Sequence, residues 1–419
     1  MPEYIEYISG LINQKRRHGP VVFLDSQKKD HPASTKSYLA AQPNAWIKSH
    51  GDELIIWDGK EVRKTRGNPW VALSEFTQQH KDWLFGYLGY DLKNYIEDLD
   101  SKNPAISSAP DMFFMVPGLL VEITNQEEIR VLKGILTDYI VPEVPTDEIF
   151  VEPKISIDKQ EYLKKIEKAQ RHIAEGDFYE INVSHALEFT FEGDEFQLYK
   201  KMRALGPVPF ASFIQIDGVT VCSSSPERFL SRKGNKVWSQ PIKGTLSRNG
   251  KDDEKHREEL LNSEKNRAEN LMIVDLVRND LSRIAKKGSV KVKNLFEVQS
   301  FETVHQLVST VQCEVESDQN SVEIIKACFP MGSMTGAPKI SAMKAIETLE
   351  DYKRGIYSGA IGYITPEQGF DFNVVIRTAI IEKGKLVFPV GGAITSDSIP
   401  EEEWEETLVK SKALTIAID

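Results

Sequence analysis

Short apolar runs separated by turn residues dominate residues 1–137, and they predict strands rather than helices. One run, Leu54–Trp57, leads into Asp58-Gly59, which is a common hairpin turn. Another, Trp83–Tyr90, is aromatic and spaced by glycines, as in a strand against which other backbone packs closely. The remaining runs are Val21–Leu24, Gly118–Ile123 and Ile129–Leu132, the last two flanking a polar turn. We therefore predict an N-terminal region built mostly of strands.

A proline-rich, acidic segment follows this region. Residues 138–157 carry Pro142, Pro145 and Pro153 among acidic side chains, a composition that is typical of linkers. The sequence thus predicts three parts, which are an N-terminal region over 1–137, a linker over 138–157 and a catalytic region over 158–419.

Helical and strand-like patterns follow one another irregularly after the linker. The expected elements are helices from Asp158 to Gly176, over 252–286 with a break near Asn262-Ser263, from Pro338, and from near Pro400 to the C-terminus, and strands around 357–365, 373–382 and 386–395. This order favours an α+β fold, with a large mixed or antiparallel β-sheet core and surrounding helices, over a doubly wound fold.

Composition and charge exclude several classes of function. The 419 residues are 40% hydrophobic and 27% charged, as in an ordinary globular enzyme, and a net charge of −11 with no long basic run argues against nucleic-acid binding. Cys222, Cys313 and Cys328 are widely spaced and form neither a zinc motif nor a disulfide framework, which suits a reducing compartment. No apolar run reaches membrane-spanning length. We expect a cytoplasmic protein that binds neither nucleic acid nor membrane.

Lys243 stands in the short segment Pro241-Ile242-Lys243-Gly244-Thr245. Lysine is mostly a surface residue, but on a short rigid segment it is either a solvated charge or a positioned nucleophile. The acids and anion receptors found elsewhere in the chain favour the nucleophile.

The last helix carries a candidate metal-binding face. Glu403, Glu406 and Lys410 share one side of it, although a solvated acidic face with an intrahelical Glu406–Lys410 pair explains the same spacing.

The central helix around residues 267–280 is unusually apolar between its charges. Its acids must be paired, capped or metal-bound, and pairing of Asp275 with Arg278 or Arg267 is the alternative to metal binding. Carboxylates from two helices suit Mg²⁺, whereas the lack of a histidine pair at ligand spacing disfavours zinc.

Three further features suit an anionic substrate. Glu227 follows Pro226 where the chain is extended or turning, and it could act as a general acid if partial burial raises its pKa; a surface pair with Arg228 is the alternative. The loop Gly332–Lys339 opens a helix whose N–H groups attract a carboxylate or a phosphate. Arg377 is a lone arginine in a β-branched strand, and its guanidinium suits a carboxylate. Together these features predict a site for a small polyanionic acid whose leaving group departs with metal and acid assistance.

Seven ordered blocks in residues 158–419 resemble the chorismate-utilising enzymes, a family that includes anthranilate synthase component I, aminodeoxychorismate synthase component I, isochorismate synthase and salicylate synthase. The blocks are Gly176–Asn182, Ser225-Pro226-Glu227, Ala268–Leu281, Leu307-Val308-Ser309, Gly336-Ala337-Pro338-Lys339, Ile376-Arg377-Thr378 and Glu403-Trp404-Glu405-Glu406-Thr407. The N-terminal region matches loosely, through Phe85–Asp91. The resemblance implies the anthranilate synthase component I-like fold.

Within this family, the segment around Lys243 is most similar to the aminodeoxychorismate synthase branch, because anthranilate synthases carry alanine in place of the lysine. The resemblance implies that Lys243 attacks C2 of chorismate as the C4 hydroxyl leaves, and that Glu227 protonates that hydroxyl. Ammonia then enters at C4 and expels the lysine, giving 4-amino-4-deoxychorismate for p-aminobenzoate and folate synthesis. The attack needs a neutral amine, so we expect the metal and burial to lower the pKa of Lys243.

The resemblance also implies a binding set. Mg²⁺ would be held by Glu269 and Glu406, with Glu403 bound directly or through water, and it would grip the ring carboxylate. The enolpyruvyl carboxylate would be held by Arg377 and Tyr357. The other expected substrate-binding residues are Thr245, Gln306, Ser333, Gly391, Gly392, Ala393 and Lys410.

Two positions depart from the family. Glu180 stands where glutamine is common, so an extra carboxylate is expected near the site, and the family's active-site histidine aligns with Gln306 rather than with His305. Leu24-Asp25-Ser26 resembles the family's tryptophan-binding strand, but a match of three residues is too short to support feedback inhibition.

No cysteine lies in the Gly-x-Cys-x-Gly elbow of a glutaminase. Ammonia is therefore expected from solution or from a partner glutamine amidotransferase subunit. The rival functions are anthranilate synthase component I, which Lys243 argues against, and isochorismate or salicylate synthase, which place a lysine near the position of Glu180. A non-catalytic binding subunit is disfavoured by the intact set of lysine and acids.

Overall fold

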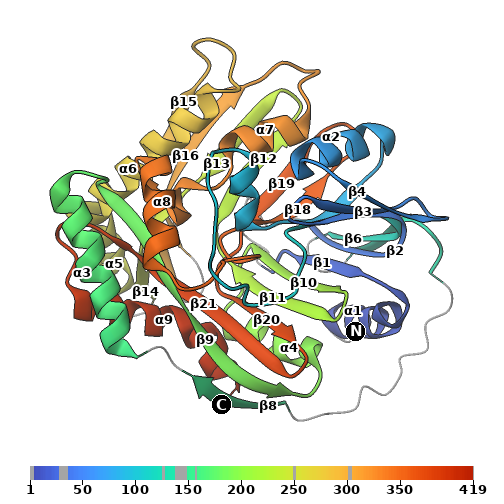
Figure 1. Cartoon of the computed structure of the whole chain (residues 1–419), viewed down its shortest axis with the longest axis horizontal. Coiled ribbons are helices and arrows are strands. Elements are labelled where there is room, and N and C mark those ends of the chain that lie inside the picture. Colours follow the sequence, from blue (N-terminus) through green and yellow to red (C-terminus); the bar gives the residue numbers. More distant parts are fainter. Residues whose placement is uncertain are drawn as a thin grey trace.

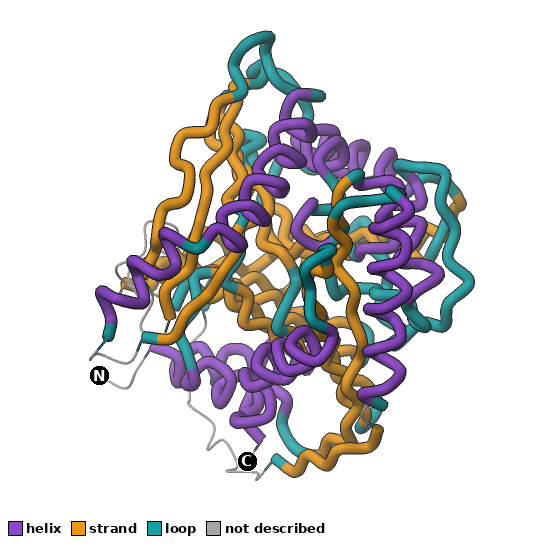
Figure 2. Tube along the Cα trace, turned by 90° about the vertical axis from the view of Figure 1, so that its left-hand side faces the viewer, coloured by secondary structure: helices purple, strands orange, loops and turns teal. Residues whose placement is uncertain are grey.

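The structure, a computed structural model, describes residues 4–27, 36–124, 128–136, 149–155, 158–248, 252–300 and 304–418. Its strands form one continuous sheet, and helices lie against it (Figures 1 and 2). The strands are β1 (Val21–Asp25), β2 (Lys36–His50), β3 (Glu53–Trp57), β4 (Val62–Arg66), β5 (Leu84–Leu88), β6 (Met112–Thr124), β7 (Glu128–Lys133), β8 (Phe150–Ile155), β9 (Glu180–Glu192), β10 (Phe210–Ile216), β11 (Val219–Ser225), β12 (Arg228–Lys233), β13 (Lys236–Gln240), β14 (Ile242–Ser247), β15 (Lys291–Ser300), β16 (Val304–Glu314), β17 (Gly336–Ala337), β18 (Ala360–Ile364), β19 (Phe370–Val374), β20 (Thr378–Glu382) and β21 (Lys385–Ile394). The α-helices are α1 (Tyr4–Lys15), α2 (Pro69–Gln79), α3 (Lys159–Glu175), α4 (Glu195–Leu205), α5 (Asp253–Asn262), α6 (Glu264–Ser282), α7 (Ser321–Cys328), α8 (Lys339–Leu349) and α9 (Pro400–Ile418), with 3₁₀ turns η1 (Arg16–His18), η2 (Tyr90–Tyr95) and η3 (Gly332–Met334).

Strand pairing follows two arms that both start at β2. One arm runs through β6, β5, β18, β19, β12 and β13 to β16, which also pairs with β14 and β15. The other runs through β1, β10, β11, β20 and β21 to β9, which also pairs with β8 and β17. These pairings are all antiparallel, as the α+β prediction requires.

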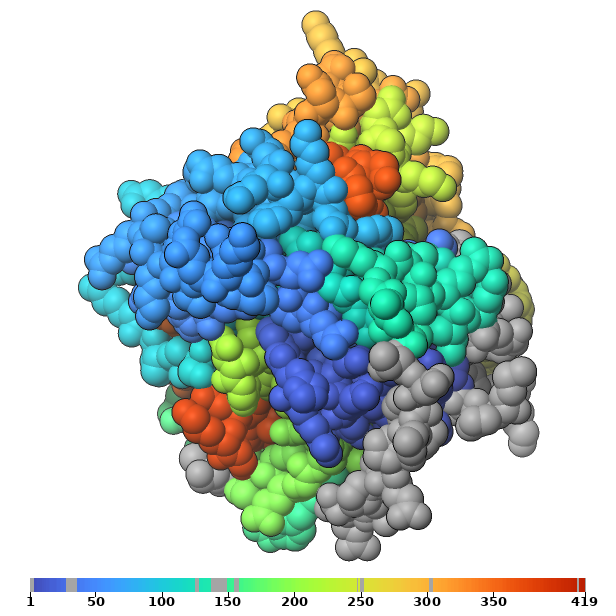
Figure 3. Space-filling view, turned by 90° about the vertical axis from the view of Figure 1, so that its right-hand side faces the viewer, coloured from blue at the N-terminus to red at the C-terminus, as the bar shows by residue number. Residues whose placement is uncertain are grey.

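Hydrogen-bonded strands connect the N-terminal region with the rest of the chain. β1 pairs with β10, and β5 pairs with β18 in a register that places Gly86 opposite Gly362. A Cβ atom on Gly86 would lie 1.9 Å from the Phe113 carbonyl oxygen, so the glycine spacing of this strand does reflect close backbone approach. Figure 3 shows the N-terminal residues forming much of one face of the molecule.

The predicted linker falls only partly on described residues. Residues 150–155 form β8, which pairs with β9, whereas 137–148 and 156–157 lie outside the described residues. The division at 138–157 therefore stays a prediction.

Several local predictions are confirmed. The Asp158 carboxylate accepts from the Gln160 N–H at the start of α3, and Gly176 ends that helix with a φ of +87°. The break at Asn262-Ser263 separates α5 from α6, and the Ser263 hydroxyl caps α6.

Other local predictions are wrong. Helix α4 lies where strand-like segments and turns were expected, and α1 and α2 lie in the region that was expected to consist mostly of strands. The strand predicted over 373–382 is divided into β19 and β20, because Arg377 adopts a φ of +51° and turns the chain between them. Arg377 therefore lies in a bend and not within a strand.

Packing fixes the helices that carry the candidate acids. A buried cluster joins α3, α8 and α9 to β9 and β21; its members include Tyr162, Ile181, Ile346, Ile394 and Trp404. Helix α6, which carries Glu269, buries Ile273 and Val277 in another hydrophobic core cluster. Each such side chain contributes ~1.5–3 kcal/mol to the stability of the fold when it is fully buried, so α6 and α9 are held firmly in place. Among the helices that the structure describes, none combines the length and the apolar character needed to cross a membrane.

Candidate active site

Lys243 is positioned by a β-bulge. The register between β14 and β16 shifts between Lys243 and Thr245, which leaves Gly244 outside the ladder. Gly244 adopts a φ of +80°, and a Cβ atom on it would lie 2.8 Å from the Asn266 side chain and 2.9 Å from that of Leu260. Glycine therefore permits both the left-handed backbone and the close approach of α5 and α6, and the bulge redirects the lysine side chain.

The Lys243 ammonium group forms a buried ion pair with Glu180. Lys243 Nζ donates to Glu180 Oε1 at 2.6 Å, and the two side chains are 11% and 2% exposed. Burial lowers the pKa of Lys243, but the charges of Glu180, Glu269 and Glu227 outweigh burial and raise the pKa above its ordinary value. The protein's own carboxylates thus act against the expected lowering of this pKa, and the expected approach of Glu180 is confirmed.

Glu227 lies in the turn between β11 and β12 and is 6% exposed. Burial raises its pKa to about 7, although the hydrogen bond from Ser333 and the charge of Lys243 act in the opposite direction. Ser333 Oγ donates to Glu227 Oε1 at 2.7 Å. Arg228, the alternative partner, pairs with Asp371 at 2.8 Å instead. A carboxyl group that holds its proton near neutral pH suits a general acid.

Glu406 on α9 acts electrostatically on both Glu269 on α6 and Glu403 on α9. Burial and the charges of Glu180 and Glu406 raise the pKa of Glu269, and burial and Glu406 raise the pKa of Glu403. The Glu406 side chain is 50% exposed; partial burial raises its pKa, but the charge of Lys410 and its hydrogen bond at 2.6 Å outweigh this and lower the pKa. This is the intrahelical pair that the sequence offered as an alternative to metal binding, and Glu406 keeps it while also acting electrostatically on Glu269 and Glu403.

Strand β21 brings glycines against these carboxylates. A Cβ atom on Gly392 would lie 3.2 Å from Glu403 Oε2 and 4.0 Å from Glu406 Oε1. The neighbouring carbonyl oxygen of Gly391 accepts from Lys410 Nζ at 2.8 Å. The missing side chain at Gly392 thus leaves room beside two carboxylates, and oxygen donors around such a space suit a hard divalent cation.

Gln306 and His305 point in different directions from β16, as successive strand residues do. Gln306 Nε2 donates to Thr245 Oγ1 at 3.4 Å, and Gln306 Oε1 is buried without a partner in the described structure. His305 instead contacts Ser300 and Asp253 through its two ring nitrogens. Gln306, and not His305, is therefore the residue beside Thr245.

Arg377 and Tyr357, the two residues predicted to bind the enolpyruvyl carboxylate of the substrate, differ in their surroundings. The Arg377 guanidinium has no hydrogen-bond or ion-pair partner among the described residues, and burial lowers its pKa while the charge of Glu227 raises it. Tyr357 is buried beside Arg354, whose guanidinium carbon lies 5.9 Å from the tyrosine ring centroid. The charge of Glu227 thus acts on Arg377, whereas Tyr357 lies beside Arg354.

Arg354 is a site-positioning residue that sequence reasoning missed. Its side chain is 1% exposed, pairs with Glu350 at 2.6 Å, and donates to the carbonyl oxygens of Met334 at 2.6 Å and Asn182 at 2.8 Å. It therefore ties η3, which holds Ser333, to β9. The signal available was an i,i+4 Glu–Arg spacing, which usually marks an exposed helical pair.

Two other acids of the central helix, Asp275 and Asp280, form ion pairs. Asp275 and Arg278 form the alternative ion pair that the sequence suggested, at 2.6 Å and more than half exposed. Asp280 is buried and pairs with Lys339 at 2.6 Å. These two acids are thereby accounted for without a metal.

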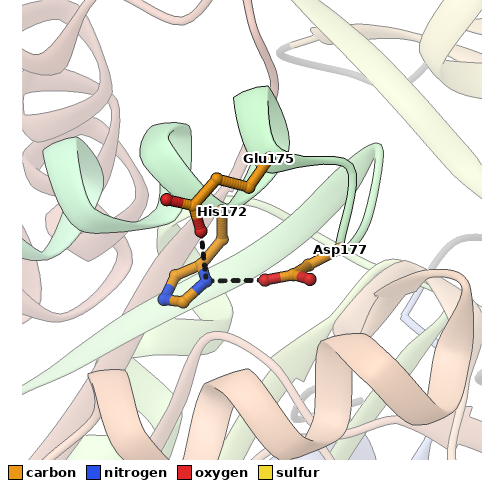
Figure 4. Close-up of side chains that lie close together, drawn as sticks. All are labelled: His172, Glu175 and Asp177. Atoms are coloured by element: carbon orange, nitrogen blue, oxygen red, sulfur yellow. Dashed lines mark hydrogen bonds and ion pairs between the residues drawn. The ribbon is translucent and has the colours of Figure 1, made fainter.

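A further cluster lies at the C-terminal end of α3. His172 Nδ1 lies 2.8 Å from Asp177 Oδ2 and 3.9 Å from Glu175 Oε2 (Figure 4). The chain folds back here through a hydrogen bond from the Asp177 N–H to the His172 carbonyl oxygen. Since all three side chains are well exposed, the helix-ending turn explains their proximity.

A separate cavity of about 530 Å³ lies beside β1 and is lined by Leu24, Asp25 and Ser26 among others. The Asp25 carboxylate accepts from Arg203 at 2.9 Å and from Tyr199 at 2.9 Å. The segment that resembles the tryptophan-binding strand of the chorismate-utilising enzymes thus borders a cavity.

Comparison with known proteins assigns the family. The profile of the chorismate binding enzymes matches residues 19–415. The chain belongs to this family. It is 32% identical to aminodeoxychorismate synthase component 1 of Klebsiella aerogenes, over 93% of this chain and 91% of that protein. It is 33% identical to anthranilate synthase component 1 of Aquifex aeolicus, over 80% of this chain and 74% of that protein.

A solved structure confirms the predicted fold class. Anthranilate synthase component I from Streptococcus pneumoniae is similar with a TM-score of 0.79 and 27% identity, over 92% of this chain and 93% of that one. The large antiparallel sheet with surrounding helices is thus the anthranilate synthase component I-like fold.

Proposed function

We propose that this chain is component I of an aminodeoxychorismate synthase, which converts chorismate and ammonia into 4-amino-4-deoxychorismate. The observation that carries the proposal is Lys243, which is buried among carboxylates and not solvated. Its segment is the one that distinguishes this branch of the family. The similarity to aminodeoxychorismate synthase component 1 over nearly the whole chain supports the same assignment.

The reaction uses one nucleophile and one acid. Neutral Lys243 forms a bond to C2 of the ring, the ring double bond shifts, and the C4–O bond breaks as Glu227 gives its proton to the departing hydroxyl, which leaves as water. Ammonia then bonds to C4, and the C2–N bond breaks and returns the lysine. The raised pKa of Glu227, about 7, supports its role, because the carboxyl group then keeps a proton to donate.

The carboxylates on α6 and α9 are proposed to hold Mg²⁺ through Glu269 and Glu406, with Glu403 bound directly or through water. The room beside Gly392 supports this fit, and so does the charge of Glu406, which together with burial raises the pKa values of both Glu269 and Glu403. Bound Mg²⁺ would neutralise the ring carboxylate of the substrate.

The remaining predicted residues are proposed to bind the substrate. Arg377 has no partner of its own among the described residues and suits the enolpyruvyl carboxylate. Tyr357 stays a prediction, since its own contacts are with Arg354. The other proposed contacts are Thr245, Gln306, Ser333, Gly391, Gly392, Ala393 and Lys410.

A partner glutamine amidotransferase subunit is proposed to supply the ammonia. The three cysteines are buried, and burial raises the pKa of each thiol, that of Cys313 to about 11. Thiols of this kind are poor nucleophiles, so none of them suits glutamine hydrolysis. We also propose a cytoplasmic location, consistent with three unpaired cysteines.

The nearest rival is anthranilate synthase component I, favoured by the similarity to the Aquifex aeolicus protein and opposed by Lys243. The deciding experiment incubates the purified chain with chorismate, MgCl₂ and an ammonium salt, and separates the products by chromatography. 4-Amino-4-deoxychorismate supports the proposal. Anthranilate, which is fluorescent, would assign the rival function.

A further inference from the structure

We propose that Glu180 is a catalytic residue of this site: it takes the proton from Lys243 before the amine attacks and returns it after the amine has left. The inference rests on the proposed function, because it requires Lys243 to act as the nucleophile.

The contact between the two residues is direct and shielded from water. Lys243 Nζ and Glu180 Oε1 are 2.6 Å apart, and the Glu180 side chain is 2% exposed. Among the described residues, this is the only ion pair that Lys243 makes within 4.0 Å. Glu180 Oε2 is buried and has no hydrogen-bond partner in the described structure. The Glu180 carboxylate therefore makes its hydrogen bond to Lys243 through one oxygen and keeps the second oxygen without a partner in the described structure.

The backbone of Glu180 is fixed in place. Glu180 pairs with Ala337 of β17, and a Cβ atom on Gly336 would lie 2.1 Å from the Glu180 carbonyl oxygen. Two residues further along β9, Arg354 holds the Asn182 carbonyl oxygen at 2.8 Å. The carboxylate is therefore presented to Lys243 by a rigid strand end, as a group that transfers protons must be.

The charges around Lys243 make an internal base necessary. Glu180 faces it from β9, Glu269 from α6 and Glu227 from the β11–β12 turn, and together they hold the lysine in its charged form. An ammonium group has no lone pair and cannot attack carbon. The proton must leave, and Glu227 must keep its own proton for the departing hydroxyl. Glu180 is the carboxylate already hydrogen-bonded to the ammonium group.

The steps balance. The proton moves from Lys243 Nζ to Glu180, which leaves a neutral amine and a neutral carboxyl group. The amine forms the bond to C2 as the C4–O bond breaks and Glu227 supplies the proton that completes water. Ammonia forms the bond to C4 as the C2–N bond breaks, and the released amine takes its proton back from Glu180. Glu227 is reprotonated by the ammonium group formed at C4.

The test compares the unmodified chain with Glu180→Gln, which keeps the shape but cannot accept the proton. We measure kcat for 4-amino-4-deoxychorismate formation from chorismate and ammonium with Mg²⁺ between pH 6.5 and 9. At pH 7 the variant should be about 10²-fold slower, the usual contribution of a positioned base. The ratio of the two rates should shrink as the pH rises, because hydroxide and buffer then deprotonate Lys243 without Glu180. Any pH effect on Glu227 is shared by both proteins and cancels in the ratio.

Two further variants keep the result interpretable. Glu188→Gln removes a carboxylate from the same strand. Glu188 lies away from the site, where its side chain pairs with Lys385 at a distance of 2.6 Å, so the variant should leave kcat unchanged. Glu180→Asp keeps a carboxylate and should restore part of the rate, with a ratio to the unmodified chain that does not change with pH.

The outcomes separate the two proposals. No 4-amino-4-deoxychorismate from the unmodified chain would overturn the proposed function. Product from the unmodified chain, together with a Glu180→Gln ratio near one or a reduced rate whose ratio is constant with pH, would overturn the role of Glu180 alone. If Glu180→Gln does not fold, Glu180→Asp decides: a rate no higher than that of Lys243→Ala, in a folded protein, would also overturn that role.

Discussion

Ser333 Oγ donates a 2.7 Å hydrogen bond to Glu227 Oε1, and the two residues come from segments more than 100 positions apart. Burial raises the pKa of Glu227 to about 7, and this hydrogen bond opposes the rise because it stabilises the charged form. The pKa of Glu227 is therefore set by two opposing effects, which are its burial in the β11–β12 turn and the hydrogen bond from the Ser333 hydroxyl group on η3.

This balance predicts the basic limb of the pH–rate profile. Glu227 must be protonated to act, so the rate should fall as the pH rises above about 7. In Ser333→Ala the hydrogen bond is lost, the pKa of Glu227 should rise further, and the limb should move to higher pH. The profile of kcat for both proteins checks this. A limb that stays in place or moves to lower pH in Ser333→Ala would contradict the assignment of Glu227.

The proposed catalytic and metal-binding residues stand in continuous sequence motifs. Lys243 is marked by the glycine that follows it, Glu227 by the proline before it, and Glu403 and Glu406 by helical spacing. These features are local, so the sequence shows them directly. The signal for α2 is equally local, because Asn68 caps this helix and Pro69 occupies its first turn.

The remaining features depend on tertiary context. The turn at Arg377 interrupts a β-branched run, and residue composition alone favours a continuous strand there. The burial of the Glu350–Arg354 pair depends on carbonyl groups of Met334 and Asn182, which only the fold brings together. The direction of the Lys243 pKa shift likewise depends on Glu180 and Glu269, which lie on separate elements.

Lys243→Ala should lose orders of magnitude in rate, because the nucleophile is removed outright. Slow residual chemistry is expected, with ammonia entering at C2 and the 2-amino isomer accumulating. Chromatography of the products at matched protein concentration measures both effects. Lys385→Ala is the control, since Lys385 also forms a 2.6 Å pair but is 40% exposed, and its loss should cost at most ~1 kcal/mol of stability and no activity. An undiminished rate of 4-amino-4-deoxychorismate formation in Lys243→Ala would refute the lysine assignment.

Glu406→Gln should abolish turnover while leaving the fold intact. The substitution removes one of the proposed Mg²⁺ ligands, and each carboxylate supplies several kcal/mol of charge stabilisation through the metal. A titration of activity with MgCl₂, combined with circular dichroism, checks both parts. Glu402→Gln changes an exposed glutamate of the same helix and should behave like the unmodified chain. Near-normal activity of Glu406→Gln in Mg²⁺ would show that the metal assignment is wrong.

The isolated chain should use ammonium salts but not glutamine as the nitrogen donor. The reason is that its cysteines are buried and their thiol pKa values are raised, so the chain has no activated thiol for glutamine hydrolysis. Parallel assays with glutamine and with ammonium chloride, each at several concentrations, measure the preference. Glutamine-dependent product from the purified chain alone would count against a separate amidotransferase partner.

Arg354→Met should destabilise the protein by about 3–5 kcal/mol, because it leaves Glu350 charged and buried without its partner. It should also lower activity, since the carbonyl groups that position η3 and β9 lose their donor. Arg278→Met is the matched control: Arg278 and Asp275 are also 2.6 Å apart on one helix but more than half exposed, so its cost should be below about 1 kcal/mol. Urea denaturation of both variants gives the two free energies of unfolding.

The double variant Glu350→Gln, Arg354→Met should recover part of the lost stability, because no unpaired charge then stays buried. Equal, small effects of Arg354→Met and Arg278→Met would mean that the buried pair contributes no more than a surface pair and does not hold the site together.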